Sequence, residues 1–79
     1  MVEVRREAAA VIGSLRDGAA RAALEQRLLD DEDPLVRRNA AYALGRIGDA
    51  SARASLQAAT SDDSSLVRMS ARAALNKLR

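Results

Sequence analysis

Apolar and polar positions alternate most regularly over residues 33–49. Apolar residues recur there at the spacing that places them on one side of an α-helix: Val36, Ala40, Ala43, Leu44 and Ile47. Asp33 is a favourable N-cap, and Pro34 is favoured at the first helical position. Gly48 terminates the pattern, because glycine adopts the left-handed C-cap conformation without steric cost. The sequence therefore predicts a helix over residues 34–47.

This pattern occurs three times along the chain. The triplets Val4-Arg5-Arg6, Val36-Arg37-Arg38 and Val67-Arg68-Met69 are spaced about 31 residues apart, which is a period typical of repeat proteins. The segments between the triplets also match, since residues 21–24 read RAAL and residues 53–56 read RASL. Internal repetition therefore decides the fold class.

Helical periodicity extends over the whole chain, and no stretch alternates with the period of a β-strand. We expect five helices with Asp49 and Ser64 as caps of the last two, at about 2–16, 19–29, 34–47, 51–60 and 65–78. The short connections between them favour antiparallel neighbours. The predicted fold is all-α, an α-solenoid of antiparallel helix pairs.

The stretch from Asp31 to Asp49 reads DxxxxVRxxAAxALGxIGD and resembles a short HEAT repeat, as found in phycobilisome-lyase-like and other bacterial or archaeal HEAT proteins and in designed HEAT-like scaffolds. The resemblance implies about two and a half HEAT-like repeats in one domain. A partial first repeat would span residues 1–17, the second 18–49 and the third 50–79. The third departs from the pattern at Arg72, Asn76 and Arg79.

The resemblance also implies roles for the repeated residues. In this family the helix that carries the Val-Arg pair lines the concave face, and its Arg bonds to an acidic turn. Structural roles are therefore expected for Arg5, Arg37 and Arg68, bonded to Asp31, Asp33, Asp62 or Asp63. The alternative is that these arginines bind an anion.

Composition removes the usual catalytic groups. The chain contains neither Cys nor His, so it lacks a thiol nucleophile, the commonest metal ligand and the usual general base. Residues 30–33 are all acidic and could bind a hard cation, but they lack the ligand spacing of a calcium loop, and capping explains them better. HEAT-like enzymes that use iron need His-Glu pairs. We therefore expect no catalytic residue, no metal and no cofactor, and a protein that is not an enzyme.

What remains is the surface of the Val-Arg helices. A mixed patch of aromatic, basic and apolar side chains resembles the composition of protein interfaces, although an ordinary solvated face is the alternative. The candidate partner-binding residues, with Tyr42 and Arg38 as anchors, are Leu35, Arg38, Asn39, Tyr42, Arg46, Arg6, Met69 and Lys77. The expected function is a non-enzymatic protein–protein interaction or scaffold module.

Several alternatives remain open. They are an accessory subunit of a lyase-like or chaperone-like system, a weak nucleic-acid binder through Arg6, Arg38, Arg46 and Lys77, and a designed repeat protein. Nucleic acid is disfavoured because the net charge is only +2. Self-association is expected through apolar side chains left unpaired at the two ends of the array, namely Val4, Val11 and Leu15 at one and Leu66, Leu75 and Leu78 at the other.

No apolar run approaches the roughly 20 residues of a membrane span, and no signal peptide is evident. A cytoplasmic location is therefore the default expectation.

Overall fold

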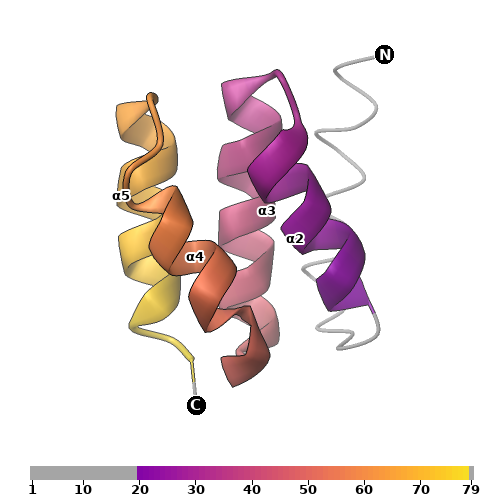
Figure 1. Ribbon diagram of the computed structural model, residues 1–79. Coiled ribbons are helices and arrows are strands. Elements are labelled where there is room, and N and C mark those ends of the chain that lie inside the picture. Colours follow the sequence, from indigo (N-terminus) through magenta and orange to yellow (C-terminus); the bar gives the residue numbers. More distant parts are fainter. Residues whose placement is uncertain (1–19, 79) are drawn as a thin grey trace.

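The computed structural model describes residues 20–78. Four α-helices and one short 3₁₀ helix follow one another: α2 (Arg21–Asp30), α3 (Pro34–Ile47), η2 (Ala50–Ala52), α4 (Arg53–Ala59) and α5 (Ser65–Leu75) (Figure 1). These residues contain no β-strand, so the all-helical prediction is confirmed for this part of the chain. Four of the five expected helices are present, and the fifth, expected over residues 2–16, lies outside the described residues.

Helix α3 has the bounds that its sequence predicts. The Asp33 carboxylate accepts a hydrogen bond from the Leu35 N–H at 3.1 Å, which satisfies one of the free donors at the start of the helix. At the other end Gly48 adopts a φ of 74°, and its N–H donates to the Leu44 carbonyl at 3.0 Å.

The last two helices differ in detail from their predictions. The chain enters α4 through η2, where the Asp49 carboxylate caps the turn by accepting from the Ser51 N–H. Helix α5 ends at Leu75, three residues early, because Asn76 is a weak helix former and the following N–H groups bond three residues back. Ser64 occupies the N-cap position of α5, but its side chain makes no capping hydrogen bond.

The helices form two layers. Helices α3 and α5 lie side by side, while α2 packs on α3 and α4 packs on α5 (Figure 1). Apolar side chains from all four helices meet between the layers, and the largest of those that are fully buried are Leu24, Leu28, Leu44, Leu56, Val36 and Val67. Buried alanines fill the remaining contacts, so the helices approach one another closely.

Glycine at position 45 permits a close contact between α3 and α5. A Cβ at this position would lie 2.9 Å from the Ala74 Cα, shorter than van der Waals contact allows. In the next repeat, Arg72 and Asn76 stand where α3 has Ala41 and Gly45. Ala41 and Gly45 are buried, whereas Arg72 and Asn76 are exposed. Helix α5 thus presents polar, bulky side chains where α3 presents small ones.

Three apolar residues were expected to be unpaired at the α5 end of the array, and two of them are partly covered. Leu75 and Leu78 are partly buried and pack against the core, because the turn after α5 returns Leu78 to it. Leu66 remains 46% exposed. Val4, Val11 and Leu15 lie outside the described residues, and self-association stays a prediction.

Gly45→Ala should destabilise the fold by about 1–3 kcal/mol, despite the higher helix propensity of alanine, because the new methyl group would meet the Ala74 backbone. Urea unfolding monitored by circular dichroism measures the change. The double variant Gly45→Ala/Ala74→Gly is the control, because it removes the other methyl group of the pair and should recover part of the loss. A Gly45→Ala protein as stable as the wild type would contradict this account of the contact.

Candidate functional site

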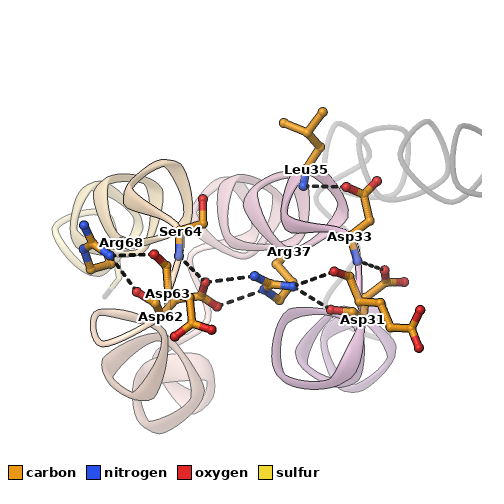
Figure 2. A network of polar contacts seen from close by, with 9 residues as sticks. Asp31, Asp33, Leu35, Arg37, Asp62, Asp63, Ser64 and Arg68 are labelled. Carbon is orange, nitrogen blue, oxygen red and sulfur yellow. Dashed lines mark hydrogen bonds and ion pairs between the residues drawn. The ribbon is translucent and has the colours of Figure 1, made fainter.

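Arg37 joins the two repeats at their acidic turns. Its Nε donates to Asp62 Oδ2 at 2.9 Å and its Nη2 donates to Asp62 Oδ1 at 3.0 Å, so the guanidinium binds both carboxylate oxygens (Figure 2). The two side chains are only 16% and 13% exposed, respectively. This pair links α3 to the turn that precedes α5.

The same guanidinium also reaches the turn between α2 and α3. Its Nη1 donates to the backbone carbonyls of Asp31, at 2.9 Å, and Glu32, at 3.1 Å. Arg68 repeats this part of the arrangement one repeat later, donating to the carbonyls of Asp62, at 2.8 Å, and Asp63, at 3.0 Å (Figure 2). Arg37 and Arg68 thus both bond to the acidic turns, while Arg5 lies outside the described residues.

The acidic residues shape the turns as well as pairing with arginine. Asp31 Oδ1 accepts from the Asp33 N–H, and Asp62 Oδ1 accepts from the Ser64 N–H, each at 2.9 Å. Asp31 lies 3.7 Å from Arg27 Nη1 as well. The Asp63 side chain is exposed, and the hydrogen bond from Arg68 goes to its backbone carbonyl.

These contacts change the acidity of the groups involved. The hydrogen bond to Asp62 raises the pKa of Arg37, against the effect of burial. Burial raises the pKa of Asp62, but the hydrogen bonds from Arg37 and the Ser64 N–H, with the charges of Arg37 and Arg68, outweigh it and leave that pKa below its ordinary value. The Ser51 N–H lowers the pKa of Asp49, and Arg21 adds to this effect.

A second polar contact joins α2 to α4, and sequence reasoning missed it. The Ser55 hydroxyl donates to Glu25 Oε2 at 2.6 Å, and Arg21 donates to Glu25 Oε1 at 2.6 Å. Arg21 Nε also lies 3.2 Å from Asp49 Oδ2. One difference between the repeats could have indicated this contact. The next copy has Gln57 in place of Glu25, and among the described residues Gln57 has no such partner.

The candidate partner-binding residues lie off the core, on what we call the outer face of α3 and α5. Figure 2 shows the Leu35 side chain on the side of α3 away from α2. Met69 and Lys77 occupy, one repeat on, the slots of Arg38 and Arg46. The outer face comprises Leu35, Arg38, Asn39, Tyr42, Arg46, Leu66, Met69 and Lys77. Arg6, the remaining candidate, lies outside the described residues.

Tyr42 is the centre of this face and is 50% exposed. The guanidinium carbon of Arg46 lies 6.0 Å from the ring centroid, and the ammonium of Lys77 lies 5.6 Å from it. Arg46 Nη1 also donates to the tyrosine hydroxyl at 3.4 Å. Arg38, one turn before Tyr42, donates to Asn39 Oδ1 through two of its nitrogens. The structure thus brings Tyr42, Arg46 and Lys77 together across two repeats.

Residues 20–78 contain neither a candidate metal site nor a candidate membrane span. No group of three or more His, Cys, Asp and Glu side chains there could hold a metal ion. None of the helices described is long and apolar enough to cross a membrane.

Comparisons with known proteins identify the repeat and correct the expected function. The HEAT repeats family matches residues 2–76. No curated protein matches the chain. Among solved structures, human deoxyhypusine hydroxylase in complex with glycerol is 38% identical with a TM-score of 0.87, over 92% of this chain and 26% of that one.

The chain therefore spans about a quarter of the length of that enzyme. The expectation of a non-enzymatic interaction or scaffold module is wrong, as is the expectation of a protein that is not an enzyme, because a protein this similar in sequence and structure is a hydroxylase. The absence of His and Cys, on which that expectation rested, concerns only the residues of this chain.

Arg37→Lys should lower the free energy of unfolding by about 2 kcal/mol, because an ammonium cannot bind both oxygens of Asp62 and the two backbone carbonyls in the same plane. Arg38→Lys is the matched control on the next residue, and chemical denaturation compares the two. Equal stability of both variants would contradict the structural function of Arg37.

Acid should remove the contribution of Asp62. Its folded-state pKa is depressed, so its stabilising effect is complete above the unfolded-state value of about 3.9 and is lost as the pH falls through the lower, folded-state value. The free energy of unfolding of Asp62→Asn should therefore fall less steeply than that of the wild type below about pH 4. Asp63→Asn, a change at the neighbouring exposed carboxylate, is the matched control, and the loss of slope should be specific to Asp62→Asn. Urea titrations from neutral to acidic pH provide the measurement.

Proposed function

The chain belongs to the HEAT repeat family, and from that premise we propose that it is a repeat segment of an enzyme related to deoxyhypusine hydroxylase. In this proposal the whole chain is one domain, an α-solenoid of antiparallel helix pairs with about two and a half repeats. The partial first repeat, over residues 1–17, supplies the fifth helix. The segment acts together with further repeats of the same enzyme.

One observation carries the proposal. The similarity to human deoxyhypusine hydroxylase combines 38% identity with a TM-score of 0.87 over 92% of this chain. Identity at this level supports a common ancestor with an enzyme.

The described residues suit the positioning of a substrate rather than the oxidation step of a hydroxylase. Hydroxylation inserts an oxygen atom and requires an oxidant held at a reactive centre. The sequence offers neither His nor Cys, and within residues 20–78 no acidic group is arranged to hold a metal. Such a centre does not fit these residues, so the reactive groups would come from other repeats.

The two layers support a positioning role for the outer face. Arg37 ties α3 to both acidic turns, and Gly45 sets the distance between α3 and α5. Helices fixed in this way would hold Tyr42, Arg46 and Lys77 in a constant arrangement. In our proposal this outer face is turned towards the substrate of the complete enzyme.

A chimera tests the proposal. The superposed quarter of human deoxyhypusine hydroxylase is replaced by this chain, and binding of a deoxyhypusine-containing peptide is measured by calorimetry. We expect a single unfolding transition and a dissociation constant within about tenfold of the unmodified enzyme, because the repeats stack in the same way.

The control replaces the same quarter by a HEAT segment of equal length from a protein that is not an enzyme. It should fold but bind the peptide much more weakly. Equal binding by the two chimeras, or a separate unfolding transition for this chain, would contradict the proposed relationship.

A further inference from the structure

Positive and negative charges are separated in the described part of the chain. Within residues 20–78 every Asp and Glu lies on α2 or in a turn, and helices α3, α4 and α5 carry none. Four of these carboxylates pair with Arg21, Arg27 or Arg37, none of which is on the outer face: Glu25, Asp31, Asp49 and Asp62. The outer face therefore has basic groups and no acidic ones.

Three cations of this face have no carboxylate partner among the described residues. Arg38 donates to the amide oxygen of Asn39, Arg46 to the hydroxyl of Tyr42, and the ammonium of Lys77 lies over the Tyr42 ring. The ion pairs of residues 20–78 instead involve Arg21, Arg27 and Arg37. Among residues 20–78 no acidic side chain of the outer face offsets these three cations, and such an arrangement attracts an anionic group.

Tyr42 is held in place rather than left free. The Lys77 stem passes next to Gly45, where a Cβ would lie 3.6 Å from the Lys77 Cδ, and this brings the ammonium to the ring. Arg46 covers the ring from its own helix. A half-exposed aromatic side chain between two cations suits the centre of an interface.

Apolar side chains extend the face beyond the charges. Met69 is 64% exposed and Leu66 is 46% exposed, both on α5. Met69 occupies the slot that Arg38 occupies on α3, so the apolar and basic groups stand on neighbouring helices. A complementary partner needs carboxylates beside apolar side chains.

We propose that the outer face binds an acidic peptide segment of a protein substrate, with Glu or Asp side chains at Arg38, Arg46 and Lys77 and an apolar side chain against Met69 and Leu66. This inference rests on the proposed function only where it calls the bound peptide part of a substrate. Nucleic acid fits less well, because its interfaces are more strongly basic, whereas this chain has a net charge of +2 and one aromatic residue for base stacking.

Binding is tested with the full chain and two labelled probes by fluorescence anisotropy. One is a short peptide of Glu and Leu, and the other has Gln in place of each Glu. The acidic peptide should bind at least tenfold more tightly, and added salt should weaken it. An oligothymidine of similar charge is the third probe. Tighter binding of this oligonucleotide, or equal binding of the two peptides, would overturn the proposal.

Variants locate the site. Tyr42→Ala should weaken binding of the acidic peptide by about tenfold, and Arg46→Gln with Lys77→Gln by about fivefold. Arg72→Gln is the matched control, since Arg72 is exposed on α5 in the slot of the buried Ala41, off the outer face; it should change binding less than about twofold. Circular dichroism checks that each variant folds, and a loss with Arg72→Gln as large as with the outer-face variants would refute the assigned face.

The two proposals fail separately. A chain that binds the acidic peptide while its chimera with the hydroxylase loses the deoxyhypusine peptide would keep the surface and refute the enzyme relationship. A functional chimera whose isolated chain ignores the acidic peptide would refute only this inference.

Discussion

The bidentate contact between Arg37 and Asp62 is the constraint on which the described arrangement depends. Its guanidinium reaches two successive acidic turns at once, so it fixes where α3 begins relative to both α2 and α5. The core beneath consists mainly of alanine and leucine, and its burial supplies most of the cohesion. The directional hydrogen bonds at the turns add a constraint on where the helices begin relative to one another.

Helix boundaries could be predicted from the sequence wherever a residue type meets one local requirement of a helix end. Asp33, Pro34 and Gly48 define α3 because a cap, a fixed φ and a left-handed residue are each local requirements. The end of α5 was less predictable, since Leu78 continues the apolar pattern through a turn that still buries it. Periodicity records which side chains face the core, but it does not record whether the backbone there is helical.

The polar network was predictable in part. The resemblance to HEAT repeats implied the contact of Arg37 with an acidic turn, and its repetition in every copy favoured a structural role over anion binding. Its contacts with two carbonyls and the link from Glu25 to Ser55 need coordinates, because they depend on how helices cross. On the outer face, the approach of Lys77 to Tyr42 joins residues of different repeats, and no local pattern indicates it. The relation to an enzyme lies beyond this kind of reasoning, because shared ancestry leaves no physical signature in a segment without reactive groups.

The polar side chains of α5 bear on how such a protein can lengthen during evolution. Gene duplication adds repeats by copying a unit next to itself, and a copy survives only if its sides are complementary. The repeat that contains α3 meets this condition, because Ala41 and Gly45 accept a neighbouring helix closely. The repeat that contains α5 does not, because Arg72 and Asn76 occupy the same places. Tandem copies of the repeat that contains α3 would therefore be tolerated, whereas copies of the repeat that contains α5 would first need to lose these bulky side chains.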